Sequence, residues 1–184
     1  MRTRALVEAA LLFGLALVSF MLFRGTTNFL NALTVPMVLY VQQGRWGGRG
    51  LFLLFAALFI GVLFFFRFQL FFIGAYFGLA VLLRWTRIWQ WSEGLRFLAM
   101  SGAAAALFVL ALLLTDWVFG LMVLPMLLNL SGGNLVGGAL FFVIIGIVIA
   151  TGLVYVSGAF DARSLTGPPA TTAEDEGLLM NSRY

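Results

Sequence analysis

Long apolar runs with very few charged residues fill the first 156 positions of this sequence. A helix needs about 20 apolar residues to cross a hydrocarbon core of about 30 Å. Of the 184 residues, 62% are hydrophobic and 10% are charged, and a soluble domain of this size cannot bury so much apolar surface. We therefore predict an all-α integral membrane protein with about six transmembrane helices. The predicted spans are residues 5–23, 29–43, 51–66, 68–83, 95–115 and 135–156.

Two segments depart from a simple span. The second run contains Asn31, Thr34 and Pro36, which predict a kinked or partly unwound helix. Residues 117–130 are apolar and contain Pro125. At about 14 residues, this segment suits a re-entrant or interfacial position better than a full crossing, although a seventh span is the open alternative.

The distribution of arginine predicts the orientation of the spans. All eleven basic residues are arginine, and six spans with both termini in the cytoplasm place nine of them inside and two outside. That asymmetry follows the positive-inside rule, whereas a seventh crossing would move the C-terminus outside. The two outer arginines are Arg24 and Arg67, and the inner ones are Arg2, Arg4, Arg45, Arg49, Arg84, Arg87, Arg96, Arg163 and Arg183.

The composition changes after the last apolar run. Gly167, Pro168 and Pro169 disfavour a helix, and an acidic stretch follows at 174–176. We predict a transmembrane bundle over residues 1–156 and a disordered cytoplasmic tail over 157–184.

The sequence lacks the residues that several kinds of catalytic and metal-binding chemistry require. It contains no histidine and no cysteine, so His-based triads, thiol nucleophiles and Cys/His zinc sites are excluded. No nucleotide-binding loop is present, and the arginines are scattered rather than gathered into a nucleic-acid-binding patch. We expect no catalytic residue, no cofactor, no metal and no nucleic-acid partner.

Small residues recur at four-residue spacing in the first run. Ala5 and Ala9 form one small-xxx-small pair, and Ala10 and Gly14 form another. Such spacing lets a second helix approach closely. The face serves either packing within the bundle or contact with a partner protein.

Uncharged polar residues gather in the predicted outer loops. If these loops converge, they form a polar mouth with aromatic walls, a composition typical of small-ligand sites. The alternative is that these residues simply meet water and that Arg67 pairs with Asp116. The candidate ligand-binding residues are Asn28, Asn31, Arg67, Asp116, Trp117, Asn129 and Asn134.

Residues 3–12, TRALVEAALL, resemble the start of YybS-like bacterial membrane proteins. Pro36 in the second run and the basic, glycine-rich turn over residues 43–50 continue the resemblance. That family is related to the substrate-binding S components of energy-coupling-factor (ECF) transporters. The resemblance implies a bacterial inner-membrane location, a vitamin-like ligand beneath the loop at residues 24–34, and a partner contact at Ala5 and Ala9.

The sequence therefore supports two main hypotheses. The first is a small-molecule-binding membrane subunit that couples to a partner membrane complex through its first helix. The alternative is a non-catalytic scaffold or assembly subunit of a cell-envelope complex, similar in size and fold to MreD. The second run lacks the Pro-Asp-Leu stretch expected of an MreD protein.

Overall fold

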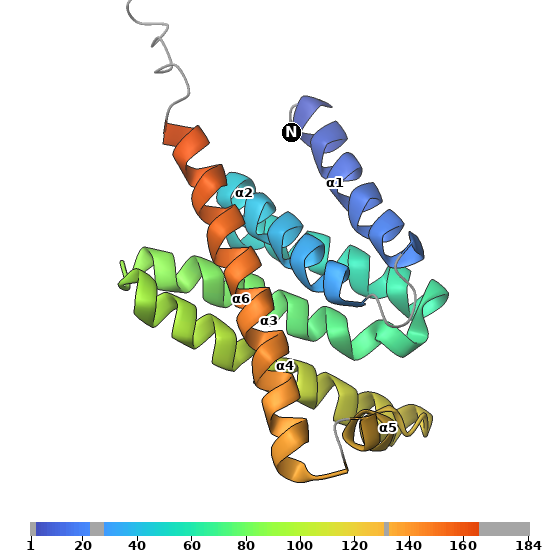
Figure 1. Cartoon of the computed structure of the whole chain (residues 1–184). Helices are drawn as coiled ribbons and strands as arrows, with labels where there is room; N and C mark the ends of the chain where they lie inside the picture. Colours follow the sequence, from blue (N-terminus) through green and yellow to red (C-terminus); the bar gives the residue numbers. More distant parts are fainter. Residues whose placement is uncertain (1–2, 23–27, 131–132, 166–184) are drawn as a thin grey trace, which may run out of the picture. The chain divides into compact units, whose positions relative to one another are not determined.

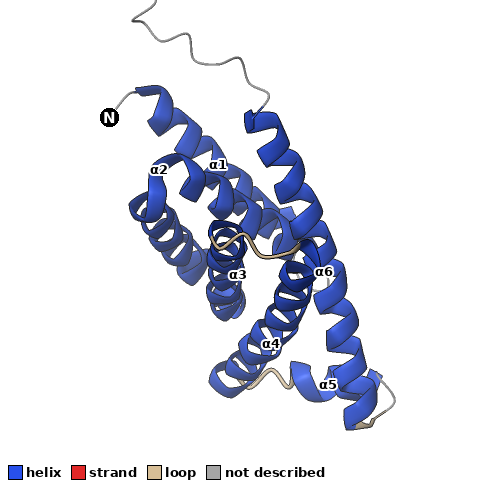
Figure 2. Ribbon diagram, turned by 90° about the vertical axis from the view of Figure 1, so that its left-hand side faces the viewer, coloured by secondary structure: helices blue, strands red, loops and turns tan. Residues whose placement is uncertain are grey.

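The computed structural model describes residues 3–22, 28–130 and 133–165, and its regular structure over these ranges is entirely helical (Figure 2). The predicted all-α class is thereby confirmed. The elements are α1 (Thr3–Leu22), α2 (Asn28–Phe65), the 3-10 helix η2 (Arg67–Gln69), α3 (Leu70–Ile88), α4 (Glu93–Phe119), α5 (Val123–Leu130) and α6 (Leu135–Leu165) (Figure 1).

Four helical segments within the described residues are long and apolar enough to cross a bilayer, so the chain is a helical membrane protein. These segments are Gly47–Phe65, Arg67–Ile88, Glu93–Phe119 and Val136–Ala159. They coincide with the last four predicted spans. The first two predicted runs are helical as well, but the strongly apolar part of α1 is the shorter stretch Ala10–Met21.

α2 consists of two arms that meet at Gly47. The backbone there has φ 68° and ψ −163°, a conformation that residues with a Cβ rarely adopt. The first arm, residues 28–46, remains helical through Pro36, so the break expected near the proline lies at the glycine instead. In Figure 1 the chain changes direction at this point before the second arm, residues 48–65.

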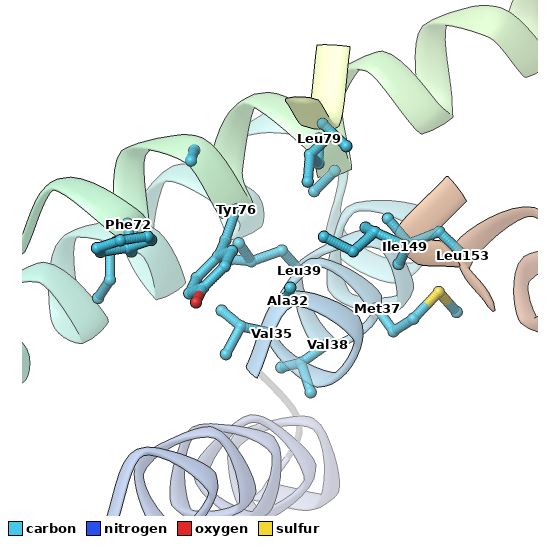
Figure 3. Close-up of a cluster of buried hydrophobic side chains, with 14 of the residues drawn as sticks. Ala32, Val35, Met37, Val38, Leu39, Phe72, Tyr76, Leu79, Ile149 and Leu153 are labelled. Carbon is cyan, nitrogen blue, oxygen red and sulfur yellow. The ribbon is translucent and has the colours of Figure 1, made fainter. Parts of the chain in front are cut away.

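The helices pack in chain order, α1 on α2, α2 on α3 and α3 on α4, and the short α5 contacts α4. The core surrounds the first arm of α2, where Val35, Leu39 and Tyr40 are buried. Figure 3 shows Tyr76 and Leu79 of α3 beside this arm, together with Ile149 and Leu153 of α6.

Glycines let α6 approach two of these helices closely. A Cβ at Gly146 would lie 2.5 Å from the backbone oxygen of Ser101 in α4. One at Gly152 would lie 2.5 Å from the side chain of Leu33 in α2. Small residues at helix crossings are typical of membrane proteins, because they bring the backbones into van der Waals contact.

The C-terminal part of α6 extends beyond the predicted start of the tail. The chain divides into two compact units, Met1–Val154 and Tyr155–Tyr184. The change in composition predicts a disordered tail from Ser157, but the helix continues to Leu165. The helix-breaking residues begin only at Gly167, which explains the difference. Residues 166–184 lie outside the described residues.

The segment predicted to be re-entrant contains the eight-residue helix α5. A helix of that length spans about 12 Å, which is too short to cross a bilayer. Gly120, with φ 65°, ends α4 just before it, and Met122 also has a positive φ of 53°. The placement of α5 relative to a membrane stays a prediction.

Candidate ligand site

A buried hydrogen bond joins α1 to α2. The hydroxyl of Ser19 donates to the side-chain oxygen Oδ1 of Asn31 across 2.5 Å, and both residues are buried. The Nδ2 amide of Asn31 is buried as well and has no hydrogen-bond partner. A buried donor left unsatisfied costs about 1–3 kcal/mol, so this amide is a candidate for binding another molecule.

A second buried amide lies where α3 begins. Gln69 ends η2, and its backbone N–H donates to the carbonyl of Phe66 across 2.7 Å. The side chain is buried, and its oxygen Oε1 has no hydrogen-bond partner. η2 contacts α2, α3 and α4, so this acceptor lies where several helices meet.

Aromatic rings connect the surroundings of the two amides. Phe20, which follows Ser19, stacks on Phe66 with ring centroids 6.1 Å apart and lies 6.2 Å from the ring of Tyr76. Tyr76 in turn lies 5.9 Å from Phe108 of α4. Figure 3 shows Phe72 and Tyr76 on α3, with the Tyr76 hydroxyl directed toward Val35.

We call Ser19, Phe20, Asn31, Phe66, Gln69 and Tyr76 the polar–aromatic cluster. Its six residues include one unsatisfied amide donor, one unsatisfied amide oxygen and three aromatic rings, and none of them carries a formal charge. Such a set of groups suits a small, flat, neutral molecule with both a hydrogen-bond acceptor and a donor.

The seven sequence-predicted ligand residues occupy different environments. Asn31 belongs to the cluster, whereas the side chain of Asn28, at the start of α2, lies outside the described residues. Arg67 begins η2 and is exposed, with its guanidinium 5.3 Å from the ring centroid of Phe68.

The other four predicted residues lie in α4, in α5 and just before α6. Asp116 is half-buried near the end of α4, and Trp117 is 82% exposed. Asn129 is an exposed residue of α5. Asn134 caps α6, since its Oδ1 accepts from the N–H of Gly137 across 2.5 Å, and this contact gives it a structural role.

Aromatic rings join two of the segments that the sequence predicts to be outer loops. Phe68 of η2 packs edge-to-face on Phe119 of α4 with centroids 5.2 Å apart. This contact brings η2, which begins at Arg67, and the end of α4 to one region. Ser19 and Tyr76 are not among the predicted site residues, although each is a hydrogen-bonding group within an apolar run.

The small-residue face predicted on the first helix is partly described. Ala10 is exposed, and a Cβ added at Gly14 would meet nothing within 4 Å. The side chains of Ala5 and Ala9 lie outside the described residues. We call the exposed apolar residues Val7, Leu11, Val18 and Met21, together with Ala10 and Gly14, the α1 outer stripe. Ala16, Ser19 and Phe20 face inward, so α1 uses its opposite side for the bundle.

These features describe a helical membrane protein with a buried polar–aromatic cluster. Comparisons with protein-family models, with curated proteins and with solved structures found no match.

Proposed function

We propose that this protein is a small-molecule-binding membrane subunit, similar in role to an ECF transporter S component, that couples to a partner membrane complex through α1. The observation that carries the proposal is the pair of unsatisfied buried amide atoms, Asn31 Nδ2 and Gln69 Oε1. A bound molecule that accepts from the first and donates to the second would recover both hydrogen bonds.

The chemistry of the cluster favours a neutral, vitamin-like ligand. Aromatic rings supply flat apolar surface, and two amide groups supply direction without charge. A charged ligand would leave its charge unpaired beside these six residues, which is costly in an apolar setting. We therefore expect a heterocycle that carries a ring amide or an equivalent donor and acceptor pair.

We further propose six crossings in a bacterial inner membrane, with both termini in the cytoplasm. Two facts support adding α1 and the first arm of α2 to the four candidate spans. α1 has 20 residues and is therefore about 30 Å long. The first arm of α2, over residues 28–46, is nearly as long, and its low hydropathy fits an interior position because most of its described side chains, over residues 30–44, are buried. In this arrangement η2 and α5 lie on the outer side, with α5 re-entrant or interfacial.

The α1 outer stripe supports coupling to a membrane partner. Its residues follow four- and three-residue spacing, so they share one helix face, and Ala10 and Gly14 leave room for a second helix. Energy for transport would come from the partner complex, because the chain carries no nucleotide-binding motif of its own.

The second candidate is a membrane scaffold or assembly subunit of a cell-envelope complex. The α1 outer stripe favours this function equally, because a scaffold also needs an open helix face. The two candidates differ at the polar–aromatic cluster, which a scaffold would not use for a ligand.

Mass spectrometry of small molecules bound to the purified native protein separates the candidates. We expect a stoichiometric compound from the wild type and its loss from Asn31→Leu and Gln69→Met, which keep side-chain size but remove the free amide atoms. Asn129→Leu, at an exposed position on α5, is the matched control and should retain the compound. Recovery of envelope-synthesis proteins with no bound compound would overturn the transporter proposal and support the scaffold.

A further inference from the structure

A tight turn joins α3 to α4, and its first N–H groups are hydrogen-bonded to the end of α3. The N–H of Trp91 donates to the carbonyl of Thr86 across 3.1 Å. The N–H of Gln90 donates to the carbonyl of Arg87 across 3.0 Å. These two bonds form a Schellman motif, in which Gln90 takes the left-handed position with φ 50°. The turn lies at the end of the α3–α4 hairpin, at the left of Figure 1.

The first turn of α4 is capped as well. The Oγ of Ser92 accepts from the N–H of Leu95 across 3.4 Å, and its carbonyl accepts from the N–H of Arg96 across 2.9 Å. The connection therefore satisfies many of its backbone groups without water. Such a segment can enter an apolar environment at a lower cost than a loop whose N–H groups depend on water.

Large apolar side chains project from the last turn of α3. Trp89 is 66% exposed, Ile88 is 64% exposed and Trp85 is 55% exposed. Because Ile88 and Trp89 follow Trp85 by three and four residues, the three side chains share one helix face. Leu83 and Thr86 are buried, so another side of α3 packs on the bundle. We call Trp85, Ile88 and Trp89 the α3 tryptophan face.

The position of the α3 tryptophan face indicates what covers it. The candidate membrane span Arg67–Ile88 ends within this face, and the candidate span Glu93–Phe119 begins just beyond the turn. An indole ring favours the membrane–water interface, because its apolar body contacts hydrocarbon while its N–H reaches headgroups or water. The next residue, Gln90, is exposed and polar. The connection thus has an apolar side and a polar tip.

We propose that the α3 tryptophan face inserts into the boundary between phospholipid headgroups and acyl chains, with Gln90 on the aqueous side. The occupant of this exposed face is lipid, since tryptophan at a span end and a hydrogen-bonded turn both suit that boundary. The contact anchors the α3–α4 hairpin at a fixed depth in the bilayer. It does not involve the polar–aromatic cluster, so it does not depend on the proposed function.

Spin labels at two neighbouring positions test the proposal. The sequence contains no cysteine, so Ile88→Cys and the matched control Gln90→Cys can each be labelled with a nitroxide at a single position. The full chain is reconstituted in phosphatidylcholine vesicles. Electron paramagnetic resonance then measures collisions of each nitroxide with molecular oxygen, which concentrates in hydrocarbon, and with a neutral nickel complex, which stays in water.

We expect the ratio of oxygen to nickel collisions to be several-fold higher at Ile88→Cys than at Gln90→Cys. Equal ratios with free access of nickel to both positions would show that the face lies in water and would overturn the proposal. A nitroxide at Ile88→Cys that neither oxygen nor nickel reaches would also overturn it, because protein would then cover the face.

A fluorescence measurement keeps the test decisive if Ile88→Cys does not fold. Phosphatidylcholine that is brominated on the acyl chain just below the headgroup quenches tryptophans at the proposed depth. We expect the amount of emission quenched by this lipid to fall in the double variant Trp85→Phe/Trp89→Phe relative to the wild type. An unchanged amount would overturn the proposal, as would loss of only the emission that aqueous iodide quenches.

Discussion

Gly146 of α6 faces the backbone oxygen of Ser101 in α4 so closely that an added Cβ would lie 2.5 Å from it. The same Cβ would lie 3.2 Å from the backbone nitrogen of Ala105. Because the obstacle is backbone, the crossing of α6 over α4 requires glycine at position 146.

Replacement of this glycine should therefore loosen the helix crossing. We expect Gly146→Ala to destabilise the folded protein by about 1–3 kcal/mol, because the helices must move apart. Gly102→Ala on α4, where a Cβ would meet nothing within 4 Å, should leave stability unchanged or slightly raised. Thermal unfolding in detergent measures both, and equal midpoints for the two variants would contradict the close crossing.

The polar groups of the polar–aromatic cluster should contribute to ligand binding rather than to the stability of the fold. The double variant Ser19→Ala/Asn31→Leu removes both partners of the buried hydrogen bond and also the unsatisfied Nδ2. We expect its unfolding free energy to lie within about 1 kcal/mol of the wild type or above it, because apolar replacements leave no unsatisfied group. The bound small molecule should be lost. A large fall in stability would mean that the pair serves the fold rather than a ligand.

The α1 outer stripe gives a prediction about partner contact. Gly14→Leu places a side chain where nothing lies within 4 Å, so the isolated protein should keep its melting temperature. Copurification with the membrane partner should fall, because the bulky residue blocks the approaching helix. The control is Gly61→Leu, whose Cβ would lie 3.3 Å from Leu17 and which should destabilise the isolated protein. Unchanged partner recovery with Gly14→Leu would place the docking surface elsewhere.

The kink at Gly47 should tolerate no side chain. Its φ of 68° with an extended ψ is a region used almost only by glycine, so Gly47→Ala should cost about 1–3 kcal/mol. The neighbouring Gly48→Ala, with open space around its Cβ, is the matched control and should behave like the wild type. Chemical unfolding in mixed micelles tests the pair, and identical curves would argue against a required kink.

The absence of cysteine from the sequence makes the proposed topology directly measurable. Single cysteines at Gln90, between α3 and α4, and at Asn129, on α5, can be labelled with a membrane-impermeant maleimide. Six crossings with cytoplasmic termini predict labelling of Asn129→Cys in intact cells and of Gln90→Cys only after permeabilisation. External labelling of Ser182→Cys would instead support a seventh crossing by residues 117–130.

The fold could be predicted from the sequence where apolar length decides the outcome. The last four predicted spans match the four candidate membrane helices, since an uninterrupted apolar run leaves few alternatives. The position of the kink could not be predicted, because a proline within a helix is the usual site of a kink, yet the backbone stays helical at Pro36 and breaks at Gly47. The break depends on the backbone conformation of Gly47. Because the segment contains several glycines, the sequence does not show which of them adopts this conformation.

The candidate site was less accessible to sequence reasoning. Asn31 stands out as an amide within a span, and loop position suggested Arg67 and Trp117, which are exposed. Whether the side chains of Ser19 and Gln69 are buried depends on which side of each helix faces the bundle. In a membrane helix both sides are apolar, so periodicity gives little information about the buried side.

The hydrogen bond from Ser19 also constrains how α1 is rotated about its own axis. Ser19 contacts Asn31 on the inner side of the helix, while Val18 and Gly14 face outward within the preceding turns. One helix therefore carries both the Ser19 contact and the α1 outer stripe, and a rotation of α1 about its axis would displace both together. Occupation of the Asn31 amide would favour one rotational setting of α1, and a partner on the far side would sense that setting as a change in the shape offered to it.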